Sequence, residues 1–220
     1  MTLRQSPLYN GGMSLFLKIL KWGGISIGVA FAALVIYRMF YLRSERKTQE
    51  QVAKIHATKL TLDDVMGENL PPPPGADADK TVQGIDTNKN GIRDDVELAI
   101  FKEYPDSAKT RAVLLQYALA LQMEVTQTIV NTGTVTEVAT EQGRADTCVA
   151  DTLVPRKSPE SSRVYSDIEK IDGFINFVEN KQFNTDARKK SHHDFYENKL
   201  GSYGDSTNDM CDIDSSTLPN

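Results

Sequence analysis

The sequence predicts a mainly α-helical protein, in which an N-terminal transmembrane helix is followed by a small helical domain. Three observations predict this fold class. The length of 220 residues suits one domain of ordinary size with appendages. One long apolar run lies near the N-terminus. Several later segments repeat their apolar residues every three or four positions, which is the period of one helix face.

The apolar run is expected to form an uncleaved membrane anchor over residues 15–42. Its central part, Trp22 to Tyr37, carries no charge and would form about 24 Å of helix, slightly less than the thickness of a bilayer core. Apolar residues continue on both sides, and Lys21 and Arg38 can extend their charged ends to the lipid headgroups. A buried core helix and a cleaved signal peptide are the alternatives. The bulky, basic stretch "YRMFYLRSERK" that follows has no small-residue cleavage site and favours the anchor.

Three further segments flank or follow the anchor. Residues 1–14 are expected to be unstructured. Residues 43–70 are charged and rich in helix-forming residues, which predicts a helical stalk. The four prolines of Pro71–Pro74 favour extended polyproline II, so residues 71–81 are expected to be a stiff linker.

The helical domain is expected to span residues 82–203. Its strongest helical signal covers residues 107–130, where Val113, Tyr117 and Leu121 recur on one face, so this helix should lie at the centre of the core. Asp106 or Ser107 can cap it. The remaining expected elements are helices over 94–104, 158–181 and 184–200, a polar loop or broken helix over 131–148, and a flexible tail over 204–220.

The stretch "GIDTNKNGIRDDVE" has the spacing of a calcium loop. Numbered from Asp86, it fits the pattern Asp-x-[Asp/Asn]-x-[Asp/Asn]-Gly-x5-Glu at every constrained position. Calcium takes six to eight oxygen ligands, and short side chains on alternate residues of a tight loop can all point inward. Gly91 permits the sharp turn. The alternative to a calcium loop is an asparagine-rich turn that only caps the following helix. The predicted Ca²⁺ ligands are Asp86, Asn88, Asn90, the carbonyl of Ile92, Asp94 and Glu97.

On these residues the loop resembles the EF-hand calcium loop, and more closely its variants in thrombospondin type 3 repeats and related bacterial extracytoplasmic proteins. The resemblance covers Gly84–Glu97, and the chain as a whole resembles uncharacterised bacterial membrane-anchored envelope proteins. Arg93 stands where a paired EF-hand has an apolar residue, and neither an entering helix nor a second loop is expected. The resemblance therefore implies a single structural calcium clamp rather than an opening switch.

The chain contains two cysteines, Cys148 and Cys211, which could be unpaired core residues or one disulfide in an oxidising compartment. Lysines and arginines flank both ends of the anchor, so the positive-inside rule does not decide its orientation. The cysteine pair and the calcium loop favour an inner-membrane protein whose C-terminal domain is periplasmic. In that compartment we expect a Cys148–Cys211 disulfide.

The leading functional hypothesis is a membrane-tethered, calcium-stabilised binding or scaffold module of the cell envelope. Its partners would be the lipid bilayer and an unidentified envelope protein, whereas the net charge of −5 argues against nucleic acid. The alternative is an envelope hydrolase that uses His192 or His193 with carboxylates. Adjacent residues of a helix point in different directions, so these two histidines are not expected to form one site.

Overall fold

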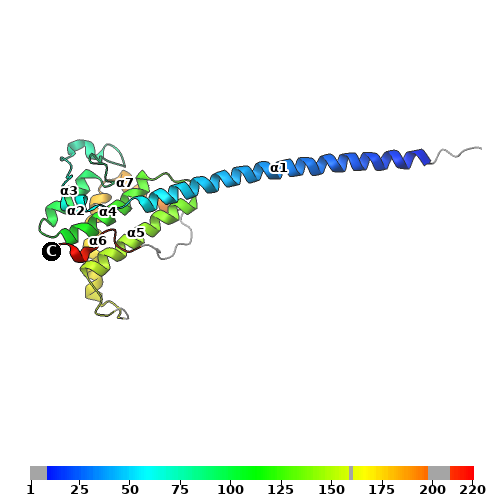
Figure 1. Cartoon of the computed structure of the whole chain (residues 1–220). Coiled ribbons are helices and arrows are strands. Elements are labelled where there is room, and N and C mark those ends of the chain that lie inside the picture. Colours follow the sequence, from blue (N-terminus) through cyan, green and yellow to red (C-terminus); the bar gives the residue numbers. More distant parts are fainter. Residues whose placement is uncertain (1–8, 159–160, 198–208) are drawn as a thin grey trace, which may run out of the picture. The chain divides into compact units, whose positions relative to one another are not determined.

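The structure is a computed structural model that describes residues 9–158, 161–197 and 209–220. These residues form helices and no strands, which confirms the mainly α fold class. The chain divides into two units, Met1–Lys47 and Thr48–Asn220, and each is described by itself (Figure 1).

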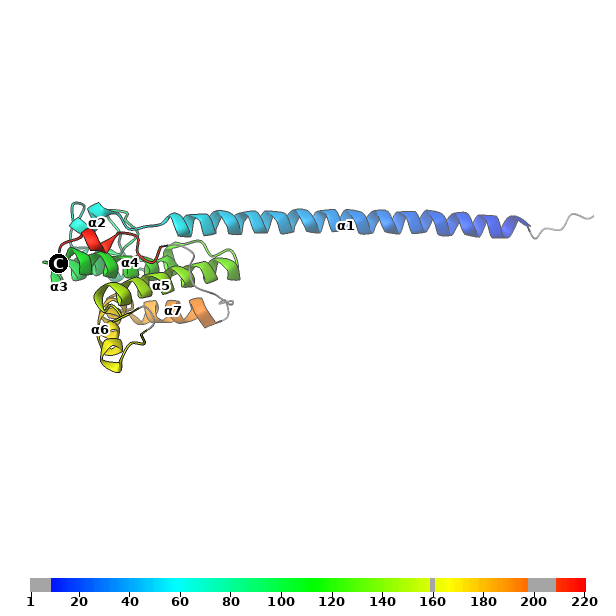
Figure 2. The ribbon, with the colours of Figure 1, turned by 60° about the horizontal axis from the view of Figure 1, so that its bottom comes forward.

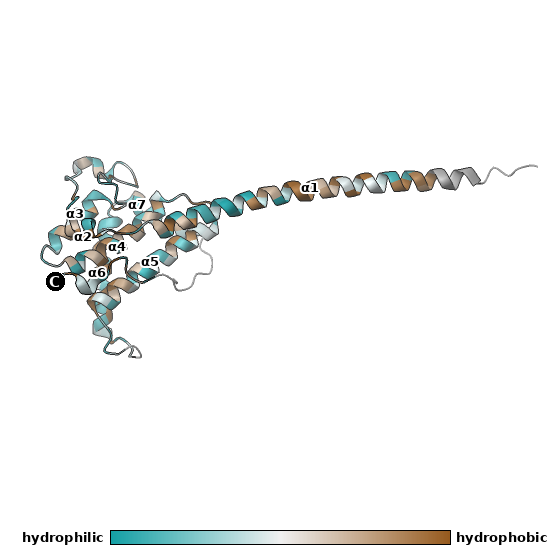
Figure 3. Ribbon diagram, in the orientation of Figure 1, coloured by the Kyte–Doolittle hydropathy of each residue, from teal (hydrophilic) through white to brown (hydrophobic). Residues whose placement is uncertain are grey.

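The first unit consists mainly of the N-terminal part of α1 (Tyr9–Ala57). Large apolar side chains from Leu15 to Leu42 are exposed along it, and Figure 3 shows the hydrophobic colour giving way to hydrophilic residues further along the helix. Within the described ranges, α1 is the one helix long and apolar enough to cross a membrane. A helix suits that environment because it satisfies its own backbone hydrogen bonds. α1 begins inside the segment expected to be unstructured, and residues 1–8 lie outside the described part.

The second unit is built around α4 (Ala108–Thr126), as the sequence predicted. Ser107 caps it by accepting a hydrogen bond from the Thr110 N–H at 3.1 Å. Every residue from Arg111 to Glu124 is buried, because other elements cover the helix on all sides. Figure 2 shows α4 and α5 side by side. The helices that pack with α4 are α2 (Leu62–Met66), α3 (Asp94–Glu103), α5 (Thr132–Leu153), α6 (Tyr165–Gln182) and α7 (Asp186–Glu197).

Helix α5 corrects the expectation of a loop or broken helix over residues 131–148. Asn131 starts the helix with a capping box, and the helix then runs unbroken to Leu153. Val135, Val138 and Cys148 on one face are fully buried. Burial of this face stabilises the helix despite its polar composition, while Gly143 lies on the exposed face, where a glycine is tolerated.

The segment expected to be a helical stalk is helical as far as Ala57, and from Thr48 onward this segment and the expected stiff linker belong to the second unit. α1 ends at Ala57, and Ile55, Leu60 and Val65 are buried in the core. The proline segment is followed by the 3-10 helix η1 (Gly75–Asp79), and the buried Arg188 guanidinium binds the carbonyl of Ala78 at 2.5 Å. A buried guanidinium requires acceptors, and the carbonyls of this segment supply them.

The C-terminal strap, residues 209–220, is also part of the fold rather than a flexible tail. Cys211 forms a disulfide with Cys148 of α5, with an S–S distance of 2.04 Å. Asp212 accepts from the buried Arg144 guanidinium at 2.7 Å, and the strap ends with the short 3-10 helix η2 (Ser215–Thr217). Residues 198–208, which include parts of the expected last helix and tail, lie outside the described ranges.

Candidate metal centre

Three predicted ligand side chains fold back onto the loop backbone. Asp86 Oδ2 accepts the Gly91 N–H at 3.0 Å. Asn88 Oδ1 accepts the Asn90 N–H at 3.4 Å, and Asn90 Oδ1 accepts the Ile92 N–H at 2.9 Å. Gly91 adopts φ +86°, as the tight turn requires. Short polar side chains on alternate residues therefore curl the chain into a closed loop.

Glu97, in the first turn of α3, returns to this loop from the other side. Its carboxylate is fully buried and accepts the side-chain amides of Asn88 and Asn90, each at 3.1 Å. Burial raises the pKa of Glu97 to about 7, although the two amide hydrogen bonds act in the opposite direction. The loop thus contains a carboxylate whose hydrogen-bond donors are neutral amides, an arrangement that a cation would stabilise.

Asp86 provides the second sign of a cation site. Its Oδ1 atom is buried and has no hydrogen-bond partner. Burial raises the pKa of this carboxyl group above its ordinary value, although backbone N–H groups of the loop oppose the shift. Buried polar atoms are normally satisfied, so this oxygen fits the role of a metal ligand. The donor set of carboxylate and amide oxygens suits a hard cation such as Ca²⁺.

The other two predicted ligands are arranged differently. Asp94 is turned towards Thr87, whose N–H and hydroxyl it accepts at 2.8 and 2.6 Å. The Ile92 side chain is fully buried and fixes the loop to the core. In the described part of the chain, no group of three or more His, Cys, Asp or Glu side chains is close enough to hold a metal. The structure therefore joins Glu97 to Asn88 and Asn90 by hydrogen bonds, whereas the Asp94 carboxylate is hydrogen-bonded to Thr87.

Two contacts outside the loop were missed by the sequence reasoning. Asn90 Nδ2 also donates to Asp64 Oδ1 of α2 at 3.4 Å, and Asn88 Nδ2 donates to the Asn69 carbonyl at 2.9 Å. A capping box starts α2 at Thr61 and could have located this helix in the sequence. No local sequence pattern indicates that Asp64 of this helix lies beside the loop.

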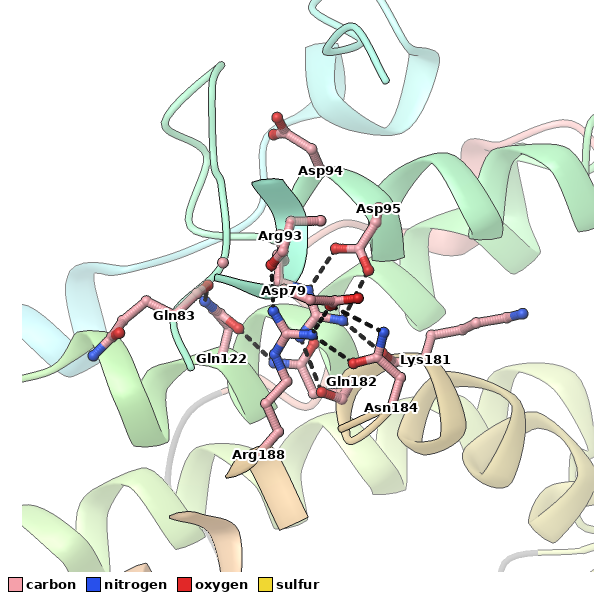
Figure 4. A network of polar contacts seen from close by, with 12 residues as sticks. Asp79, Gln83, Arg93, Asp94, Asp95, Gln122, Lys181, Gln182, Asn184 and Arg188 are labelled. Atoms are coloured by element: carbon pink, nitrogen blue, oxygen red, sulfur yellow. Dashed lines mark hydrogen bonds and ion pairs between the residues drawn. The ribbon is translucent and has the colours of Figure 1, made fainter. Parts of the chain in front are cut away.

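Arg93 explains why position 8 of the loop is not apolar (Figure 4). Its fully buried guanidinium donates to the carbonyls of Lys181 and Gln182 at 2.6 and 3.0 Å, at the end of α6. It also pairs with Asp95 at 2.5 Å. A cation is favourable at a helix C-terminus, where backbone carbonyls lack helical partners. Arg93 therefore ties this loop to α6, where a paired EF-hand would contact a second loop.

The histidines considered for catalysis do not share a site. His192 pairs with the buried Glu124 at 2.8 Å, whereas His193 faces Glu197 on its own helix at 3.5 Å. The hydrogen bond to Glu124 raises the pKa of His192, which favours its protonated form and makes it a poorer general base. The small pocket beside His192 has room for about one water molecule.

No family model, no curated protein and no solved structure matches this chain. Its function is therefore inferred from the loop chemistry, the disulfide and the apolar helix.

Proposed function

We propose that the protein is a membrane-tethered, calcium-stabilised binding or scaffold module of the cell envelope. The observation that carries the proposal is the buried, unpartnered Oδ1 of Asp86 in a loop that also holds the buried Glu97 carboxylate. Without a cation, the buried Glu97 carboxylate and the buried Oδ1 atom of Asp86 lose hydration that no positive charge replaces. The apolar α1 helix supports the tether.

The loop residues would divide the binding of the ion between them. Asp86, Asn88 and Asn90 would offer side-chain oxygens, Ile92 would offer its carbonyl, and Glu97 would offer its carboxylate. Bound Ca²⁺ supplies positive charge that compensates the buried Glu97 carboxylate and the half-buried Asp86 carboxylate. Asp94, held by Thr87, would act through a water molecule, as the ninth position of such loops often does.

The ion would stabilise the fold, which a thermal melt can measure. A dissociation constant of ~10⁻⁵ to 10⁻³ M, as in sensors and extracellular modules, gives about 1–4 kcal/mol of stabilisation at 10 mM Ca²⁺. We expect Ca²⁺ to raise the Tm of the full chain in detergent micelles. Glu97→Gln should abolish this shift, because it removes the negative charge that the ion compensates. Glu103→Gln, an exposed change on the same helix, is the matched control. A wild-type Tm unchanged by Ca²⁺ and by chelator would refute the calcium site.

The disulfide supports a periplasmic second unit, because disulfides persist in oxidising compartments. Protease added to sealed cells with a permeabilised outer membrane should digest this unit, and protease added to inverted inner-membrane vesicles should leave it protected. Digestion from the cytoplasmic face alone would reject this orientation.

An exposed apolar group on α6 supports the binding role. Val164, Tyr165 and Ile168 lie in and just before its first turns with 53%, 75% and 45% of their surfaces exposed. Contiguous exposed apolar residues commonly mark contacts with another protein. A photo-crosslinking amino acid at position 165 should yield a defined adduct in envelope preparations, and the same probe at the exposed position 189 of α7 is the control. Equal labelling at both positions would count against a partner at α6.

A further inference from the structure

We propose that Asp64 of α2 is an additional ligand of the calcium site, so that the ion joins the loop to the Thr61–Asn69 segment. This inference rests on the proposed calcium site and adds a ligand from outside the loop pattern. The juxtaposition of Asp64 Oδ1 with the loop amide of Asn90 is the observation behind it.

The side-chain amides of the loop each lie between Glu97 and the α2 segment. Asn90 Nδ2 donates to Glu97 Oε1 at 3.1 Å and to Asp64 Oδ1 at 3.4 Å. Asn88 Nδ2 donates to Glu97 Oε2 at 3.1 Å and to the Asn69 carbonyl at 2.9 Å. Oxygens of Glu97 and of the Asp64–Asn69 segment therefore lie on either side of the same two amide groups. Acceptor oxygens that gather around N–H groups can also bind a hard cation.

Charge strengthens this inference. Asp64 is 7% exposed and Glu97 is fully buried, and one neutral amide group lies between their carboxylates. Two acids brought together away from water repel each other, and an amide only partly compensates them. A divalent ion would remove this repulsion. The nearby Arg93 is directed to Asp95 and the end of α6 instead.

The Asp64 carboxylate divides its two oxygens between two roles. Oδ2 accepts the N–H and the hydroxyl of Thr61 at 3.0 and 2.5 Å, which forms the capping box of α2. Oδ1 is the oxygen that faces the loop. Helix capping therefore orients the side chain and leaves one oxygen for the ion.

The α2 segment holds this carboxylate on a fixed support. Val65 is fully buried, and Gly67 has φ +77° at a position where a Cβ atom would lie 2.8 Å from the Phe101 ring of α3. Such close packing suits a residue that binds an ion, because the Asp64 side chain then needs little rearrangement when the ion binds. In chain order, α2 follows α1 directly. Calcium would therefore stabilise the path by which the chain leaves α1 and enters the helical domain.

Calcium affinity of the full chain in detergent micelles, measured by equilibrium dialysis with ⁴⁵Ca²⁺, tests the inference. We expect Asp64→Asn to weaken binding by about tenfold or more, as for loss of a charged ligand. Asp63→Asn removes an exposed acid from the same helix and is the matched control. This variant should bind Ca²⁺ with wild-type affinity.

The outcomes separate this inference from the proposed function. Wild-type affinity in Asp64→Asn, with binding lost in Glu97→Gln, would overturn the role of Asp64 and leave the calcium site standing. No binding by the wild-type chain would overturn both. Amide hydrogen exchange in the wild type provides a readout that does not depend on a variant's folding. Calcium should slow exchange in residues 61–69, and unchanged exchange there would also reject the inference.

Discussion

Breaking the Cys148–Cys211 disulfide should lower the stability of the second unit by several kilocalories per mole. The bond closes a loop with a sequence separation of 63 residues. For a loop of that length, the chain-entropy model gives about 14 cal/mol/K, which corresponds to about 4 kcal/mol at 25 °C. In a unit of this size each kilocalorie per mole shifts the Tm by about 2–4 °C, so a decrease of about 8–16 °C is expected.

The C-terminal strap has other contacts that should keep it in place after reduction. Gln116 exchanges two hydrogen bonds with the strap, donating to the Met210 carbonyl at 2.9 Å and accepting the Asp212 N–H at 2.8 Å. Arg144 also pairs with Asp212. The main effect of reduction should therefore be the greater freedom of the unfolded chain rather than loss of native contacts.

Circular dichroism melts of the full chain with and without reductant measure this effect. Reductant should not change the Tm of the Cys148→Ala/Cys211→Ala double variant, which controls for effects of reductant elsewhere. A reduced wild-type protein that melts within about 2 °C of the oxidised form would refute the reasoning, because the chain-entropy model predicts a far larger decrease in Tm. Two free thiols detected by mass spectrometry in native material would contradict the disulfide itself.

Two further predictions concern the loop and the His192 pair. Gly91→Ala should destabilise the second unit by about 1–3 kcal/mol with or without Ca²⁺, because φ is +86° and the new methyl group would lie 2.6 Å from Leu119 Cδ1. In the same melts, Gly143→Ala, which points into open space on α5, should be neutral or stabilising. The hydrogen bond that His192 donates to Glu124 raises the pKa of His192. The pair therefore stabilises the fold fully below the unfolded-state pKa near 6.5 and loses this contribution as pH rises through the folded-state value. The Tm difference between wild type and His192→Gln should therefore be larger at pH 5.5 than at pH 9, and a difference independent of pH would contradict the assignment.

Local patterns were reliable where the interacting residues are neighbours in sequence. The Ser107 cap and the apolar period beyond it were enough to predict α4, and α3 starts at Asp94 within the predicted region. The curled backbone of the loop follows from hydrogen bonds between residues two to five positions apart. Such contacts depend on spacing, which can be read directly from the sequence.

Local patterns failed where distant packing outweighs local preference. Residues 131–148 contain glycine and many threonines, yet they form part of α5 because their apolar face is buried against α4. The prolines before the loop predicted a stiff spacer outside the domain, yet Arg188, which lies more than a hundred residues later, binds the carbonyls of Ala78 and Thr81. Neither the spacing nor the composition of these segments predicts which other part of the chain will pack against them.

The sequence by itself determined that the chain is mainly helical, that one helix is long and apolar enough to cross a membrane, and that short polar side chains are spaced to curl the loop backbone. These properties depend on periodicity and residue type within about a dozen positions. The tertiary structure alone decided that Cys148 meets Cys211, that Asp94 turns to Thr87, and that Asp64 faces the loop. Those contacts depend on which conformation buries the apolar faces of several helices at once, and this balance is a property of the whole fold.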